Sequence, residues 1–159
     1  MNEFTEAMRQ LAAGVAVVTV QEGRDDIGTT VTTFTSLSVN PPMVLLSLDS
    51  AGYLCEVMLR QDQWAVTLLS GTQAVIASRF ATPGRPSARL LVAGDPHHRG
   101  ARTGAMIIDG GVAAMEVETS RVVPGGDHTL FVATVLAVDY VDPSLPPLVR
   151  LRGRYRAFG

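Results

Sequence analysis

The segment Gly28-Thr-Thr-Val-Thr-Thr-Phe-Thr-Ser-Leu-Ser38 carries a hydroxyl group on most of its residues. If its first part is a β-strand, side chains alternate between the two faces, so hydroxyls line both of them. Because threonine suits a strand, the segment could simply be an exposed edge strand with solvated hydroxyls. Strand periodicity is lost at residues 35–38, however, and Pro41-Pro42 then fixes the exit into an apolar segment. We therefore predict a corner at residues 30–38 whose hydroxyl and backbone N–H donors bind a polar, planar ligand.

The segments before this corner predict a helix and a β-hairpin. Apolar residues at positions 4, 8, 11 and 12 share one face of a helix that ends at Gly14 and is expected to pack on the strands. Residues 15–20 form a β-branched apolar run. A polar, solvated turn at residues 22–26 connects this run to the hydroxyl-rich strand, which predicts a hairpin.

The segments after the corner alternate between strands and helices. The apolar run at residues 43–48 predicts a strand that is buried on both faces. A short helix follows residues 49–52, and Ser70-Gly-Thr-Gln73 matches a capping box ahead of a helix at residues 74–80. Residues 82–102 lack periodicity and predict a surface loop. Further strands are expected at residues 64–69, 107–108, 112–123, 130–141 and 148–155, with Glu116 and Glu118 on the wet face of the third of these.

The length and composition fit one globular domain spanning residues 1–159. The net charge of −2 leaves no basic stripe, so we expect no binding to nucleic acid. Cys55 is the only cysteine, which excludes an internal disulfide, argues against a Cys-ligated metal and favours the reducing cytoplasm. We expect neither a signal peptide nor a membrane span. His97 and His98 have no third ligand at metal spacing, so we predict solvated loop residues and no metal.

Two motifs resemble those of a known family. The hydroxyl-rich corner and the following Pro41-Pro-Met-Val-Leu-Leu-Ser-Leu-Asp49 resemble the signature of the short-chain flavin reductases. These are FMN-binding split-barrel proteins, the reductase components of two-component flavin-dependent monooxygenases. Gly126-Asp127-His128, at the entrance of a strand, resembles the family motif whose histidine lies beside the flavin and the nicotinamide. Residues 64–69 are similar to a family strand in which Thr67 here replaces the usual Asn, and the resemblance covers residues 8–155.

The resemblance implies a mainly β fold, an antiparallel split β-barrel of the Greek-key type with six or seven strands and a few peripheral helices. It also implies a homodimer that binds flavin near the subunit interface. The implied function is NAD(P)H:flavin oxidoreductase, transferring hydride from NADH or NADPH to FMN or FAD and supplying reduced flavin to a partner monooxygenase. Two alternatives stay open: a split-barrel monooxygenase or oxidase that uses oxygen itself, and a non-catalytic flavin-binding module. The chain has no Gly-x-Gly-x-x-Gly turn, which argues against a Rossmann-type dinucleotide domain.

The same resemblance assigns candidate site residues. Hydride passes directly between two stacked rings, so the protein mainly has to position them. His128 would orient the nicotinamide or the reduced flavin and Asp127 would hold the turn, although an isolated histidine of this kind is more often structural. A flavin phosphate could use the helix start at residues 49–52, where Asp49 and Ser50 could instead be helix caps, and the basic residues that follow Phe80, with Arg89 as the leading candidate. The cofactor-binding candidates are Thr30, Val31, Thr32, Thr33, Ser36, Leu37, Ser38, Asp49, Ser50, Ala51, Thr67, Leu68, Leu69, Phe80 and Arg89.

Overall fold

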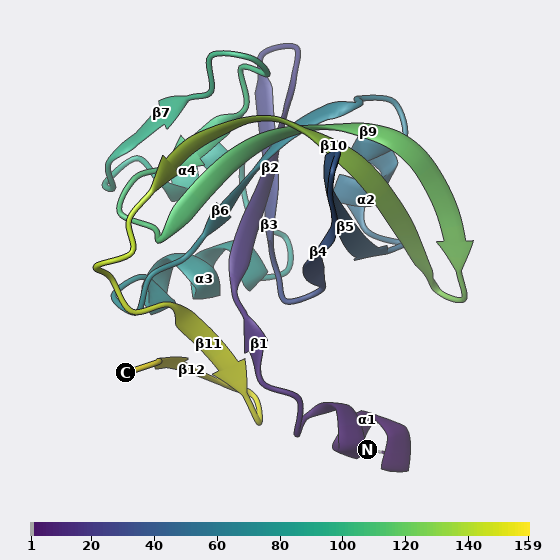
Figure 1. The fold of residues 1–159 in the computed structure, drawn as a ribbon, viewed down its shortest axis with the longest axis vertical. Coiled ribbons are helices and arrows are strands. Elements are labelled where there is room, and N and C mark those ends of the chain that lie inside the picture. The colour runs from purple at the N-terminus through teal and green to yellow at the C-terminus, as the bar shows by residue number, and fades with distance from the viewer. Residues whose placement is uncertain (1) are drawn as a thin grey trace.

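The computed structural model describes residues 2–159, and a curved seven-stranded sheet dominates it (Figure 1). The strand order is β3-β2-β6-β9-β10-β5-β4, and every neighbouring pair is antiparallel. The two edge strands, β3 and β4, follow one another across residues 32–33 without pairing, which leaves the split in the barrel. The strands of this sheet are β2 (Ala16–Glu22), β3 (Asp25–Val31), β4 (Phe34–Val39), β5 (Pro42–Asp49), β6 (Gln63–Leu68), β9 (Ala113–Gly125) and β10 (His128–Val141).

Short helices and two small sheets surround the barrel, so the predicted antiparallel β fold with a few peripheral helices is confirmed. No helix within residues 2–159 is long and apolar enough to span a membrane. The helices are α1 (Glu3–Met8), α2 (Tyr53–Met58), α3 (Ala74–Ala81) and α4 (Ala88–Leu91). One small sheet joins β1 (Ala13–Gly14), β11 (Leu148–Leu151) and β12 (Arg154–Ala157), and the other joins β7 (His97–Arg99) and β8 (Met106–Ile108).

Alternate residues of the segment 15–20 serve two hydrophobic clusters, which explains its unbroken apolar run. Ala16, Val18 and Val20 belong to the cluster inside the barrel. Val15 and Val17 belong to a second cluster, to which α3 and α4 also contribute. Because both faces are covered, burial of this one segment stabilises two layers of the protein.

Helix α3 packs closely on β3 because residue 28 is a glycine. A Cβ at Gly28 would come within 2.9 Å of the ring of Phe80, which is fully buried. The hydroxyls of Thr30 and Thr29 donate to the carbonyls of Ala77 and Phe80, at 2.6 and 3.4 Å respectively. Part of the hydroxyl-rich run therefore holds α3 on the barrel.

Helix α1 differs from its prediction. It ends at Met8 instead of continuing to residue 12, and none of its residues is buried, so the expected packing on the strands is wrong for this chain. Gly14 lies in β1 and does not end the helix. The helix is held instead beside the β11–β12 turn, where Arg152 donates from its Nε to Gln10.

Three strand predictions also need correction. The hydroxyl-rich run breaks at residues 32–33, and residues 35–38 continue in β4 with a bulge between Ser36 and Ser38. Strand β5 is fully buried on one face only, because its alternate residues Val44, Leu46 and Leu48 face the core of an antiparallel barrel. The predicted last strand is a hairpin, β11 and β12. In the segment expected to be a loop, α4 and β7 form.

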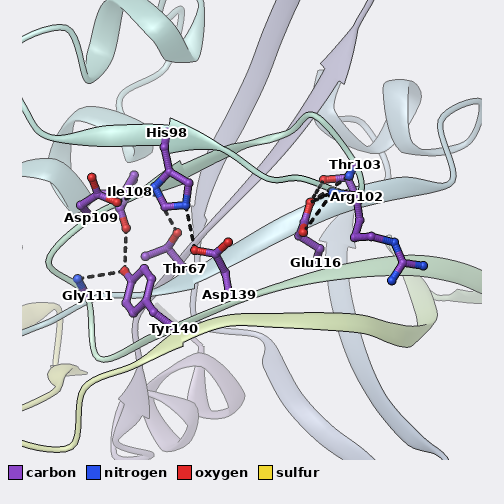
Figure 2. Close-up of polar contacts among 10 residues, drawn as sticks. All are labelled: Thr67, His98, Arg102, Thr103, Ile108, Asp109, Gly111, Glu116, Asp139 and Tyr140. Atoms are coloured by element: carbon purple, nitrogen blue, oxygen red, sulfur yellow. Dashed lines mark hydrogen bonds and ion pairs between the residues drawn. The ribbon is translucent and has the colours of Figure 1, made fainter.

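Two acidic residues expected in solvent are buried. The carboxylate of Glu116, 2% exposed, accepts hydrogen bonds from the backbone N–H groups of Arg102 and Thr103 and from the Thr103 hydroxyl (Figure 2). Asp26, 1% exposed, forms two bonds with the guanidinium of Arg99, at 2.7 and 2.9 Å. In both cases the segment at residues 97–105 supplies the partner, a long-range contact that strand periodicity does not reveal.

Candidate active site

A cleft of about 560 Å³ lies between β3 and the end of β5. One wall is β3 with the two residues that follow it, and the other is the end of β5 with the start of α2. The loop before α4 and the first residue of β10 complete it. Its lining residues include Thr29, Thr30, Val31, Thr32, Thr33, Ser47, Asp49, Gly52, Tyr53, Arg85 and His128.

The threonines along this cleft divide into those that support the fold and those that are free to bind. Thr29 and Thr30 use their hydroxyls on α3, and the Thr33 hydroxyl donates to the carbonyl of Ser47 at 2.5 Å. Neither the hydroxyl nor the backbone N–H of Thr32 forms a hydrogen bond within residues 2–159. Thr32 therefore presents two unused donors at the point where the chain leaves β3.

Arg85 is the one cationic side chain that lines the cleft among the described residues. Its Nε donates to the carbonyl of Gly28 at 2.7 Å, and burial lowers the pKa of its guanidinium from the ordinary value. The nearby carboxylate of Asp26 is already paired with Arg99. Arg85 forms no ion pair with a carboxylate of the described residues, so its positive charge is available for an anion.

His128 is the first residue of β10, and it pairs in register with Asp49, the last residue of β5. Its Nδ1 donates to the carboxylate of Asp127 at 2.8 Å, and this hydrogen bond lowers the pKa of Asp127. The turn is fixed from the other side, because the N–H of Ser50 donates to the Asp127 carbonyl at 3.0 Å. With 41% of its side chain exposed, His128 is held by the turn and still open to the cleft.

This arrangement fits a flavin. The isoalloxazine edge needs hydrogen-bond donors, which Thr32 offers, and a phosphate needs a cation, which Arg85 offers. The exposed ring of Tyr53 lines the same cleft and gives a surface on which a planar ring can stack. Donors, cation and aromatic surface therefore lie in one cleft of a size suited to a small molecule.

The structure brings some of the sequence candidates together and separates others. Thr30, Val31, Thr32, Thr33, Asp49 and His128 line the cleft. Ser50, Ala51 and Asp127 lie in the adjoining turns, where the N–H of Ala51 donates to the Asp49 carboxylate. Eight candidates lie outside the cleft. Four of them line a second groove: Ser36, Ser38, Leu68 and Leu69. Of the other four, Leu37 and Arg89 are exposed, and Thr67 and Phe80 are buried.

Thr67 and Phe80 have structural contacts instead of cleft contacts. The Thr67 hydroxyl accepts from the N–H of Ile108 at 3.2 Å, and Phe80 packs against Gly28. Sequence reasoning missed Arg85, Tyr53 and Ser47. The sequence showed the positive charge of Arg85 but not its position in the cleft. That position depends on a hydrogen bond to Gly28, which is 57 residues away in the sequence.

A second polar cluster, none of whose residues lines the cleft, surrounds His98 (Figure 2). His98 Nδ1 lies 2.6 Å from Asp109 and its Nε2 lies 2.8 Å from Asp139, so the prediction of a solvated loop residue is wrong for His98. Burial alone would lower the pKa of the imidazole, but the hydrogen bonds to the two carboxylates outweigh it and raise that pKa above 6.5. Close by, the hydroxyl of Tyr140 donates to the carbonyl of Ile108 at 2.6 Å.

Comparisons with known proteins find flavin reductases among the relatives of this chain. The chain is 37% identical to the NADH-dependent FMN reductase AsuE2 of Streptomyces nodosus subsp. asukaensis, over 97% of this chain and 83% of that protein. It is 32% identical to the reductase component of 4-hydroxyphenylacetate 3-monooxygenase of Thermus thermophilus, over 96% and 93%. A solved structure of the NADH:FAD oxidoreductase SgcE6 of Streptomyces globisporus, in complex with NAD and FAD fragments, superposes with a TM-score of 0.90 at 29% identity, covering 98% of this chain and 91% of that one.

The family model for the flavin reductase like domain matches residues 8–159, which is nearly the whole chain. The resemblance inferred from the hydroxyl-rich corner and the Gly-Asp-His turn is thereby confirmed. The chain belongs to the flavin reductase like domain family.

Proposed function

We propose that the protein is an NAD(P)H:flavin oxidoreductase that reduces FMN or FAD with NADH or NADPH and passes the reduced flavin to a separate monooxygenase. We further propose that it works in the cytoplasm as a homodimer. The observation that carries the activity is the cleft in which Thr32, Arg85 and His128 converge in a chain of the flavin reductase family. The named relatives, a reductase component among them, support the two-component role.

When bound, the nicotinamide supplies the hydride and the flavin accepts it. The protein residues mainly position the rings. The donors of Thr32 would hold the polar edge of the flavin, and Arg85 would bind its phosphate. His128, oriented by Asp127, fixes the ring that lies against it without transferring a proton.

Arg85 takes the phosphate role in this proposal in place of Arg89. Arg89 is exposed on α4 and does not line the cleft. Helix α2, whose start was the other candidate for the phosphate, has only 6 residues, and the Asp49 carboxylate at its entrance accepts from Ala51. A short helix behind a carboxylate is a weaker anion site than a guanidinium.

Steady-state oxidation of NADH or NADPH in the presence of excess free flavin tests the activity. A reductase oxidises many equivalents of nicotinamide and releases reduced flavin, which a separately purified flavin-dependent monooxygenase can use. Tight flavin binding without turnover would instead identify a binding module. Oxidation that continues with bound flavin alone and consumes an organic substrate would identify a monooxygenase that uses oxygen itself.

A further inference from the structure

Arg99 on β7 pairs with a buried carboxylate that borders the active-site cleft. Its guanidinium donates to the carboxylate of Asp26 from Nη1 at 2.7 Å and from Nη2 at 2.9 Å. The Asp26 side chain is 1% exposed and lines the cleft, whereas the Arg99 side chain is 44% exposed and does not line it. A guanidinium held by two bonds neutralises a carboxylate effectively, so Arg99 controls the charge of a cleft that it does not enter.

The chain on both sides of Arg99 is fixed to the barrel by buried or partly buried carboxylates. The preceding residue, His98, contacts the carboxylate of Asp139 on β10 at 2.8 Å. A few residues further on, the N–H of Thr103 donates to the carboxylate of Glu116 on β9 at 2.8 Å. Figure 2 shows both contacts. Arg99 is therefore held in place by its own segment and does not depend on a ligand for its position.

The cationic side chain inside the cleft approaches the same stretch of β3. Arg85 donates from its Nε to the carbonyl of Gly28 at 2.7 Å, two residues after Asp26. The hydroxyl of Ser87 donates to the carbonyl of Asp26 itself at 3.2 Å. Arg85 forms no ion pair with a carboxylate of residues 2–159. Asp26 would be a natural partner for Arg85 if Arg99 did not already occupy it.

We propose that Arg99 is a positioning residue for flavin binding: by pairing with Asp26 it keeps the Arg85 guanidinium free to bind the flavin phosphate. Without Arg99, Asp26 would be an unpaired buried carboxylate, which is costly, so Arg85 would turn to pair with it. Any charge left on Asp26 would also repel the phosphate. The other carboxylates that line the cleft among the described residues, Asp25 and Asp49, are exposed and screened by solvent. The proposal rests on the phosphate role proposed above for Arg85.

Titration with FMN and with riboflavin, which lacks the phosphate, tests this role. R99Q keeps a long polar side chain but removes the charge, so the Kd for FMN should rise about tenfold or more, while the Kd for riboflavin stays nearly unchanged. D26N/R99Q removes the carboxylate as well and should restore the FMN Kd of the unaltered protein. Calorimetric titration measures both ligands, and denaturant unfolding gives the folded fraction by which each Kd is corrected.

The matched control breaks another arginine–aspartate pair. Arg79 contacts Asp95 at 2.7 Å, its side chain is 43% exposed, and neither residue lines the cleft. R79Q should therefore change neither Kd. An unchanged ratio of FMN to riboflavin affinity in R99Q would mean that Arg99 serves only the fold, and this overturns the proposal.

The double variant and R85A distinguish the remaining outcomes. Weak FMN binding that persists in D26N/R99Q overturns the proposal, because Arg99 would then act on FMN by a route other than Asp26, and this result stands even if R99Q alone does not fold. A selective loss of FMN binding in R85A without one in R99Q refutes this inference alone. Equal weakening of FMN and riboflavin in R85A refutes the phosphate role on which the inference rests.

Discussion

His98 Nε2 lies 2.8 Å from the carboxylate of Asp139, and this contact ties β7 to the long strand β10. The other ring nitrogen contacts Asp109 at the same time, so both nitrogens can donate only when the imidazole is protonated. The two carboxylates therefore favour the charged form of His98, in agreement with its raised pKa.

The stability of this contact should depend on pH. Because the folded pKa of His98 is raised above its ordinary value of 6.5, the stabilisation is fully present below pH 6.5 and is lost as pH rises through the folded pKa. The side chain is partly exposed, so solvent screening limits the effect to about 1 kcal/mol or less. Denaturant unfolding of the unaltered protein and H98Q, at pH values on either side of this range, measures it. H98Q should lose the pH-dependent increment, whereas H97Q, at an exposed neighbour, should keep it.

Removing the hydroxyl of Thr32 should weaken flavin binding. T32V keeps the shape of the side chain but removes a donor that no other described residue uses, so flavin affinity should fall by about 1 kcal/mol, or about fivefold in Kd. T30V is the matched control, because the Thr30 hydroxyl bonds to Ala77 in α3. It should lower the free energy of unfolding by about 1 kcal/mol and leave the Kd per folded molecule unchanged. Fluorescence titration and denaturant unfolding of both variants would separate the two roles, and an unchanged Kd in T32V would reject the assignment.

Arg85 should distinguish FMN from riboflavin. If its guanidinium contacts the phosphate, R85A should weaken FMN binding by about 2 kcal/mol, the cost of losing a charge-assisted hydrogen bond, and leave riboflavin binding nearly unchanged. R89A removes an exposed arginine from the adjacent helix and should change neither affinity. Calorimetric titration with both ligands measures the difference. Equal weakening of FMN and riboflavin in R85A would mean that Arg85 shapes the cleft through Gly28 and does not bind phosphate.

His128 should act on the rate of hydride transfer. H128A is expected to slow flavin reduction at saturating flavin, because a displaced ring loses near-attack geometry, while the melting temperature and the flavin Kd stay close to those of the unaltered protein. D127N, which keeps a side-chain acceptor for the His128 ring, should have a smaller effect. Stopped-flow reduction read beside a melting curve tests this. Lower stability and weaker flavin binding with an unchanged reduction rate would show that His128 is structural.

The parts of the fold that depend on local pattern could be predicted from the sequence. The apolar runs at residues 15–20 and 130–141 and the alternation in β9 predict the antiparallel sheet, because strand patterns are local. The burial of Glu116 could not be predicted, because the hydrogen-bond donors that satisfy its carboxylate lie in a loop and approach it only in the folded chain. The predicted packing of α1 on the strands was wrong for a related reason. Amphipathic spacing indicates that a helix has an apolar face, but it does not indicate what covers that face.

Site residues in continuous motifs could likewise be predicted, whereas those placed by long-range contacts could not. Thr32 and His128 were found because their motifs are continuous in the sequence, and both line the cleft. Arg85 was missed because its place depends on how the loop before α4 returns to β3. Hydroxyl density also gave no means of separating Thr30, which binds a helix carbonyl, from Thr32, whose hydroxyl has no hydrogen-bond partner among residues 2–159.

The segment at residues 15–20 contributes to both hydrophobic clusters, and this affects how the protein unfolds on heating. Val17 and Val18 are neighbours in the chain, yet one belongs to the cluster beneath α3 and the other to the barrel interior. Detaching either layer exposes the back of a strand that the other layer needs, so neither can be lost alone. The barrel and its helical cover should therefore unfold in a single cooperative transition, with the same midpoint by the fluorescence of Trp64 and by circular dichroism.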